Sequence, residues 1–399
     1  NKSLSGSVTI NNGTVSVSGG QLNNNITVNS GATLIGAGAH YVLANGKTIT
    51  LNGGTLDVGG LYIETGGASV TGIVLNNGTV TGTSGGHYLA QGWVANGNNT
   101  VNEQISMEST KANSGLFDIQ SGTTTINATM YNYVSRYLGL TKNGTGTLVL
   151  SGNNSFGSST AGSTLNNGTL VLNHANALGA AGNLWTIVSG TLDNRSGSAL
   201  TLTNNSIQNW NGDFAFTGTR DLNMGTGNVT MNASGNFTVG GVISGSTFGL
   251  TKNGSGTMIL TGANTYNGTT TINAGTLQIG NNSTGSIASP TVVNNADLVY
   301  RMSGGAITAP TTITGTGNLT MQAGSTIVIG SGNITLGGNV VISTATGGLN
   351  GLRFDNISRS ISAASINITG QIGEQNASQG NQKLTLDTSA YNGDIYLNV

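Results

Sequence analysis

Residues 140–156 read LTKNGTGTLVLSGNNSF, and residues 250–266 read LTKNGSGTMILTGANTY, so one pattern occurs twice in the chain. Ten of the seventeen positions are identical, and six of the other seven are exchanges such as Ser for Thr or Tyr for Phe. These exchanges preserve the shape and the polarity of the side chain. Such self-similarity is typical of a repeat protein, in which equivalent residues occupy equivalent environments.

A shorter unit recurs inside this long period, namely Gly-Thr-Val or Gly-Thr-Leu followed by alternating polar and apolar residues. Neighbouring copies often follow one another at a nearly constant interval, as from Gly54 to Gly78, and from Gly146 through Gly168 to Gly190. A spacing in the low twenties is typical of one turn of a β-solenoid.

Within each unit the apolar residues alternate with polar ones, as in Val15/Val17 and Leu170/Leu172. A period of two indicates strands with one buried face, whereas a helix needs spacings of three and four. Twelve Asn-Gly dipeptides separate the strands. Asn and Gly tolerate positive φ and therefore suit tight corners between strands.

An array of antiparallel hairpins is the competing fold, because Asn-Gly is also the preferred turn of a hairpin. Parallel coils, however, place equivalent residues about 4.8 Å apart, so that repeated Asn or Thr forms a ladder and repeated Leu a continuous core. The low charged fraction of 6% suits such stacking, because like charges on successive coils would repel. We therefore predict an all-β fold: a right-handed parallel β-helix (β-solenoid), an elongated single rod and one domain over residues 1–399.

The composition excludes several classes of function. The net charge is −1 and the basic residues are scattered, so the electrostatic footprint of nucleic-acid binding is missing. The chain has no cysteine, which excludes disulfides, thiolate metal sites and thiol catalysis. No apolar run approaches the roughly 18 residues of a transmembrane helix. We therefore expect neither a nucleic-acid partner nor a transmembrane segment.

The stretch 210–280, which includes GNFTVGGVISG and GLTKNGSGTMILTGANTYNGTTTINAGTLQIG, closely resembles the autotransporter-associated β-strand repeat, or passenger-associated transport repeat. Residues 140–179 resemble a second copy with a three-residue insertion before Asn166. The resemblance implies a right-handed β-helical passenger on a secreted or surface-displayed bacterial protein. It implies no single activity, because such repeats are scaffolds. Both a processed passenger and a free-standing subunit exported by another route remain open.

Acidic residues are the first candidates for chemistry, because some parallel β-helices cleave polysaccharides. Hydrolysis of a glycoside needs two carboxylates roughly 5 to 9.5 Å apart. The best grouping is Asp193 and Asp213, about one coil apart, with Arg195 and Arg220 close in sequence. We interpret these carboxylates as corner caps paired with arginine.

Histidines are too widely separated to form a site. Each of His40, His87 and His174 is separated from the next by more than one coil, and distant coils of a rod cannot converge on one metal or substrate. We predict no catalytic residue, no cofactor, no metal and no enzymatic activity.

One aromatic concentration, residues 130–137, is a candidate contact patch consisting of Tyr131, Tyr133, Arg136 and Tyr137. Aromatic side chains with an arginine can stack on sugars or anchor a protein partner. The alternative is that the three tyrosines alternate along a strand and pack against the next coil or a lateral neighbour.

The favoured function is structural: an extracellular β-solenoid subunit of a bacterial surface filament, fibre or coat. We expect self-association, because the open last coil of a solenoid is an unpaired edge and residues 1–30 show no polar cap. The alternative is an adhesin or glycan-binding passenger that contacts polysaccharide or a cell surface. Both predict a secreted, extracellular or cell-surface protein.

Overall fold

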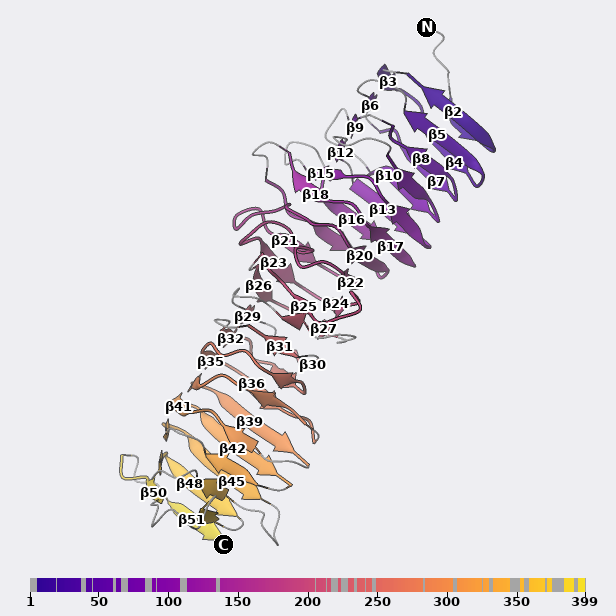
Figure 1. Cartoon of the computed structure of the whole chain (residues 1–399). Coiled ribbons are helices and arrows are strands. Elements are labelled where there is room, and N and C mark those ends of the chain that lie inside the picture. Colours follow the sequence, from indigo (N-terminus) through magenta and orange to yellow (C-terminus); the bar gives the residue numbers. More distant parts are fainter. Residues whose placement is uncertain are drawn as a thin grey trace. The chain divides into compact units, whose positions relative to one another are not determined.

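The structure is a computed structural model that divides into two compact units, Asn1–Gln208 and Asn209–Val399. It describes residues 6–18, 20–36, 41–44, 46–59, 62–65, 71–82, 88–90, 92–107, 113–133, 137–204, 206–212, 214–216, 222–223, 229–232, 235–240, 242–245, 249–282, 284–303, 307–324, 326–329, 333–344, 352–354, 359–369, 372–374, 384–390 and 394–398. Within these residues every regular element is a β-strand (Figure 1).

The strands of the first unit recur in a fixed order on three faces. The first face contains β1 (Val8–Ile10), β4 (Ile26–Asn29), β7 (Ile49–Asn52), β10 (Thr71–Asn76), β13 (Gly92–Asn96), β16 (Leu116–Ile119), β19 (Thr141–Asn143), β21 (Ser163–Leu165) and β23 (Leu184–Ile187). The second contains β2 (Gly13–Val17), β5 (Ala32–Gly36), β8 (Thr55–Asp57), β11 (Thr79–Thr81), β14 (Asn99–Val101), β17 (Thr123–Ile126), β20 (Thr147–Leu150), β22 (Thr169–Leu172) and β24 (Gly190–Asn194). The third contains β3 (Gly20–Leu22), β6 (Tyr41–Leu43), β9 (Tyr62–Thr65), β12 (Tyr88–Ala90), β15 (Ile105–Met107), β18 (Met130–Asn132) and β25 (Leu200–Thr201).

The second unit repeats this order, and β26 (Ile207–Trp210) runs across the boundary between the units. Its first face contains β29 (Val229–Met231), β32 (Leu250–Lys252), β35 (Thr270–Ile272), β38 (Thr291–Asn294), β41 (Thr312–Gly315), β44 (Ile334–Leu336), β47 (Arg359–Ser362) and β50 (Leu384–Asp387). Its second contains β27 (Phe214–Phe216), β30 (Phe237–Val239), β33 (Thr257–Leu260), β36 (Thr276–Ile279), β39 (Asp297–Met302), β42 (Asn318–Ala323), β45 (Asn339–Thr344), β48 (Ser365–Thr369) and β51 (Ile395–Asn398). Its third contains β28 (Leu222–Asn223), β31 (Ile243–Ser244), β34 (Ala263–Asn264), β37 (Ser286–Ile287), β40 (Ile307–Ala309), β43 (Ile327–Ile329), β46 (Leu352–Phe354) and β49 (Ile372–Glu374).

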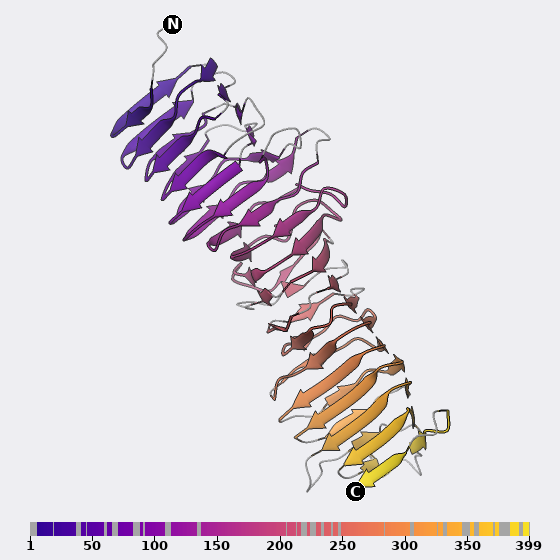
Figure 2. The ribbon, with the colours of Figure 1, turned by 180° about the vertical axis from the view of Figure 1, so that it is seen from behind.

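Successive strands on one face pair in parallel, which makes each unit a β-solenoid, and Figure 2 shows the stacked strands from behind. The number of residues per coil varies. Val8 and its partner Ile26 are much closer in sequence than Ile366 and its partner Ile395. The all-β, parallel solenoid fold is therefore confirmed, and the antiparallel hairpin array is excluded for the paired strands. One domain over residues 1–399 stays a prediction.

The core is built from columns of apolar side chains at matching positions on the second face. In the second unit Leu277, Leu298, Leu319 and Val340 pair in register along β36, β39, β42 and β45, and each is 0% exposed. Because the column is continuous, each coil buries its apolar residues against the coil before it and the coil after it. This is the shared core that the alternating pattern predicts.

Asparagine ladders connect the coils of both units at the ends of first-face strands. In the first unit each Nδ2 donates to the Oδ1 of the preceding coil, over 2.7, 3.3, 2.8 and 3.3 Å. The members of this ladder are Asn11, Asn29, Asn52, Asn76 and Asn96. The polar ladder expected from stacked asparagines is thus present.

An equivalent ladder runs through the second unit, with Nδ2 to Oδ1 distances of 3.0, 3.1, 2.8 and 3.4 Å. Its members are Asn211, Asn232, Asn253, Asn273 and Asn295. A side-chain amide both donates and accepts, so each interior member satisfies its neighbours on both sides. Polar side chains therefore reinforce the same register that the apolar columns fix.

Candidate functional site

The Lys142 ammonium in the first repeat copy is a buried charge that is held by main-chain oxygens. Lys142 lies in β19 and is 0% exposed. Its Nζ donates to the main-chain oxygens of Asn143 at 2.7 Å, Gly144 at 2.8 Å and Asn167 at 3.1 Å. Asn167 belongs to the next coil of the solenoid. One buried cation thus binds the corner of its own coil to the corner of the next.

Lys252 makes two of the three equivalent hydrogen bonds in the second copy. It lies in β32 and is 0% exposed, and its Nζ donates to the main-chain oxygens of Gly254 at 2.7 Å and Ala274 at 2.8 Å. The contact to Ala274 again crosses to the next coil. The lysine of the LTKNG motif is therefore a corner cap in both copies.

Burial sets the electrostatics of both lysines. Loss of hydration lowers the pKa of Lys142 to about 8, while the Asp118 carboxylate acts in the opposite direction. Burial likewise lowers the pKa of Lys252 to about 8, and here Asp297 opposes the shift. Because the charged form loses hydration in the interior, main-chain carbonyls replace the water that a surface lysine would bind.

The rest of the repeated stretch also occupies matching environments. Asn154 and Asn264 are both buried, and their side-chain oxygens accept from the main-chain nitrogens of Met130 at 2.9 Å and Ile243 at 2.8 Å. The aromatic residue that ends the stretch, Phe156 or Tyr266, is 0% exposed in each copy. The internal repeat in the sequence is thus a repeat of structure.

Only part of the segment that carries the predicted contact patch lies in a β-strand. Tyr131 lies in β18, pairs with Ser106 and is half-buried. The strand ends at Asn132, so the expected alternation of three tyrosines along one strand is wrong. Tyr133 follows the strand and its nitrogen donates to the oxygen of Met107 at 3.0 Å. Its side chain is half-buried too.

Of the other two patch residues, the structure describes Tyr137. Tyr137 is 54% exposed, the highest exposure of any large hydrophobic side chain in the described residues. Arg136 lies outside the described residues. The tyrosine patch as a binding site stays a prediction, and its exposed member is Tyr137.

The candidate acid pair is only half described. Asp193 is 1% exposed, and its Oδ2 accepts from Arg195 Nε at 2.7 Å, which fits a corner carboxylate paired with arginine. Asp213 and Arg220 lie outside the described residues.

Metal-ligand side chains are sparse where the structure describes them. His174 Nδ1 accepts from the Asn176 nitrogen at 3.0 Å, whereas His40 and His87 lie outside the described residues. In the described ranges no group of three or more His, Cys, Asp or Glu side chains could hold a metal ion.

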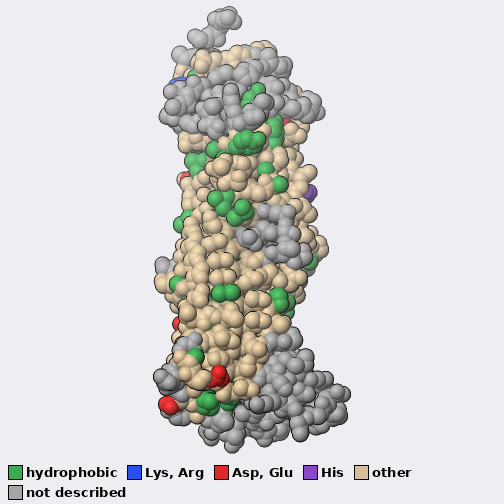
Figure 3. Space-filling model, turned by 90° about the vertical axis from the view of Figure 1, so that its left-hand side faces the viewer, with side chains coloured by type: hydrophobic (Ala, Val, Ile, Leu, Met, Phe, Trp, Pro, Cys, Tyr) green, Lys and Arg blue, Asp and Glu red, His purple; other side chains and the backbone are tan. Residues whose placement is uncertain are grey.

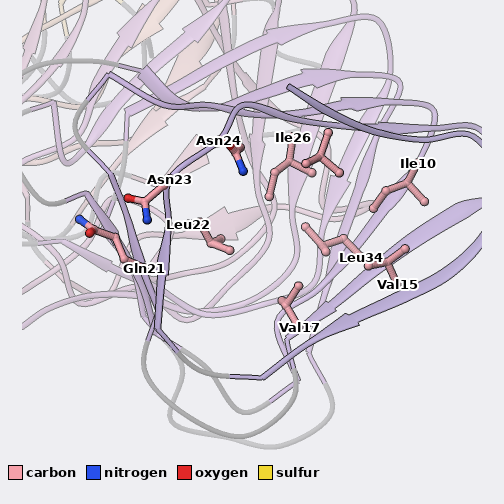
Figure 4. Close-up of a pocket in the computed structure, with 10 residues that line it drawn as sticks. Ile10, Val15, Val17, Gln21, Leu22, Asn23, Asn24, Ile26 and Leu34 are labelled. Carbon is pink, nitrogen blue, oxygen red and sulfur yellow. The ribbon is translucent and has the colours of Figure 1, made fainter. Parts of the chain in front are cut away.

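The first coil presents an apolar hollow of about 240 Å³ (Figure 4). It is lined by ten residues from the first strands, namely Val8, Ile10, Val15, Val17, Gln21, Leu22, Asn23, Asn24, Ile26 and Leu34. Val15 lies in the apolar column of the second face, where it pairs with Leu34. Leu34 is 2% exposed, whereas Val15 is 39% exposed. This surface has the side chains of a solenoid core but faces outward.

The last described coil has a similar surface. Ile395 in β51 pairs with Ile366, and it is 42% exposed whereas Ile366 is 0% exposed. On the lateral face in Figure 3, by contrast, apolar side chains form small separate patches among uncharged polar groups.

None of the described residues forms a helix that is long and apolar enough to cross a membrane. The fold and its repeated lysine corners define the class of the protein as a parallel β-solenoid. The model of the passenger-associated transport repeat family matches residues 140–172 and 250–279, so the chain carries two such repeats. This confirms the family that the sequence resembles. No curated protein matches the chain, and no solved structure matches it either.

Each match covers a little more than one coil: residues 140–172 extend from β19 to β22, and residues 250–279 from β32 to β36. Each therefore includes both the lysine and the next-coil corner that the lysine binds. The repeat unit is thus one coil together with its attachment to the next. Repeats of this family are typical of autotransporter passengers, which are secreted or displayed at the cell surface.

Proposed function

We propose that this chain is a structural β-solenoid subunit of a bacterial surface filament, fibre or coat, in which copies stack end to end. The observation that supports this proposal is the outward-facing apolar column at Val15, whose next member Leu34 is buried.

A second copy of the chain fits this surface by its chemistry. Ile395 offers an apolar side chain from a second-face strand, as Val15 does, and both side chains are about equally exposed at 42% and 39%. Stacking β51 of one copy on β2 of another would extend the apolar column and the parallel pairing together. The proposed location is secreted, extracellular or at the cell surface.

The experiment compares wild-type protein with Val15→Lys by electron microscopy and sedimentation over a range of concentrations. We expect particles that lengthen with concentration, and at least about tenfold weaker association in the variant, because an ammonium would be buried in an apolar contact. The matched control is Val188→Lys, since Val188 is a valine with a similar exposure of 44%. Particles that stay short at every concentration, or equal losses in both variants, would contradict end-to-end stacking.

A second candidate function is that of an adhesin or glycan-binding passenger, and the exposure of Tyr137 at 54% favours it. An exposed tyrosine can stack on a sugar ring. In a binding assay on a polysaccharide panel, Tyr137→Ala should weaken binding up to about tenfold, whereas Tyr137→Phe should retain it because the ring remains. Equal binding by all three proteins would remove Tyr137 as the site.

A further inference from the structure

The corner between β21 and β22 holds an asparagine whose side chain contacts the main chain of the next residue. Asn167 is exposed, and its Oδ1 accepts a hydrogen bond from the main-chain nitrogen of the following residue, Gly168, at 2.7 Å. Gly168 has a φ of 74°. The side-chain amide of Asn167 is thus already folded back toward the nitrogen of Gly168.

We propose that Asn167 is a self-modifying site that deamidates through a cyclic imide formed with Gly168. The Gly168 nitrogen attacks Asn167 Cγ and forms a new N–C bond. The Cγ–Nδ2 bond then breaks, and Nδ2 leaves as ammonia with the proton lost from the Gly168 nitrogen. Water opens the imide at one carbonyl or the other, giving an aspartyl or an isoaspartyl residue, and no oxidant or enzyme is required.

An asparagine ladder explains why Asn167 differs from Asn253 in the second repeat copy. Asn253 also precedes a glycine and is also exposed, but its Nδ2 donates to Asn232 at 3.1 Å and its Oδ1 accepts from Asn273 at 2.8 Å. Turning its Cγ toward the Gly254 nitrogen would break both bonds. Each lost hydrogen bond raises the barrier, so Asn253 should react at least about tenfold more slowly than Asn167.

The rate of deamidation at Asn12 should lie between the rates at Asn167 and Asn253. The Gly13 nitrogen donates to Asn12 Oδ1 at 2.8 Å, which resembles the contact at Asn167, but it also donates to the Gly31 oxygen at 3.3 Å. Attack on Cγ therefore requires the Gly13 nitrogen to leave a bond to the next coil. We expect the order Asn167, then Asn12, then Asn253.

The reaction has a structural consequence at the lysine corner. The main-chain oxygen of Asn167 accepts from Lys142 Nζ at 3.1 Å. An isoaspartyl link inserts a methylene group into the backbone and moves this carbonyl, while the new carboxylate adds one negative charge to a chain whose net charge is −1. The modification would therefore weaken the cap that ties one coil to the next.

The second repeat copy supplies the control variant. Ala274 occupies the position that matches Asn167, and its oxygen still accepts from Lys252 Nζ at 2.8 Å. Asn167→Ala should therefore fold normally while it cannot form the imide. The experiment incubates wild-type and Asn167→Ala full-length protein at neutral to mildly alkaline pH and follows each Asn-Gly peptide by mass spectrometry, with isoaspartate detection.

We expect an aspartyl and isoaspartyl product at Asn167 at least about tenfold sooner than at Asn253, because the ladder bonds of Asn253 must break first. We also expect an acidic charge variant to accumulate in wild-type protein and to be greatly reduced in Asn167→Ala. Equal rates at Asn167 and Asn253, or an Asn167 that stays intact while Asn253 reacts, would overturn the proposal. A thermal melt of Asn167→Ala close to wild type establishes that folding is unchanged.

Discussion

Gly122→Ala should lower the free energy of unfolding by about 3–5 kcal/mol or prevent folding, because the added Cβ has no space. Gly122 has a φ of +67° at the corner before β17. A Cβ there would overlap the main-chain carbonyl of Gly97 and lie 2.7 Å from its Cα. All of these atoms are backbone of the preceding coil, so only a separation of the two coils could relieve the overlap.

Gly182→Ala is the matched control. Gly182 has nearly the same φ, +71°, but a Cβ built there meets nothing within 4 Å. Its replacement should therefore cost only the backbone strain of a left-handed residue, about 1–2 kcal/mol. Chemical denaturation of both variants measures the difference. If both substitutions lower the free energy of unfolding by the same amount, the close approach between coils at Gly122 plays no part in stability.

This pair of glycines shows how far the sequence predicts the fold. The Asn-Gly dipeptides correctly indicate corners: Gly144 and Gly168, for example, have φ of 75° and 74°. The sequence around Gly122 and Gly182 does not reveal, however, that only Gly122 lies against the backbone of the neighbouring coil. That depends on coil length, which varies with insertions that the alternating pattern does not reveal.

The candidate sites show a similar limit. The lysine is identical in both copies of the repeat, and the chain has only 12 Lys and Arg residues, so the sequence contained a signal for a special role. The signal does not reveal burial, because a lysine would ordinarily be placed at the solvent-exposed surface. The sequence shows the tyrosines as a cluster. It does not show that β18 ends at Asn132, because that depends on the turn that follows the strand.

Lys142→Met should lower the free energy of unfolding at pH 7 by about 3 kcal/mol, because main-chain acceptors lose a buried, charged donor. Methionine has a similar length and fills the same space. Lys252→Met should have a somewhat smaller effect, since Lys252 Nζ donates to two main-chain oxygens, those of Gly254 and Ala274, whereas Lys142 Nζ donates to three. Denaturant midpoints of the two single variants and the double variant measure these effects.

The effect of Lys142→Met should also grow as the pH rises. The pKa of Lys142 is about 8 in the folded protein, below its ordinary value of 10.5. Between these two values the unfolded chain binds more protons than the folded chain at this group, so the contribution of Lys142 to stability increases with pH across that window. Well below the folded-state pKa both states are protonated and the contribution is constant.

Comparison of wild-type and variant protein at each pH isolates this effect. Buried Tyr266, whose pKa is raised by loss of hydration, titrates alike in both proteins and cancels from the difference. We therefore expect the stability gap between wild type and Lys142→Met to be larger at pH 10 than at pH 7. A gap that stays constant over this range would mean that the main-chain oxygens around the buried ammonium fully replace its lost water, and it would contradict a lowered pKa for Lys142.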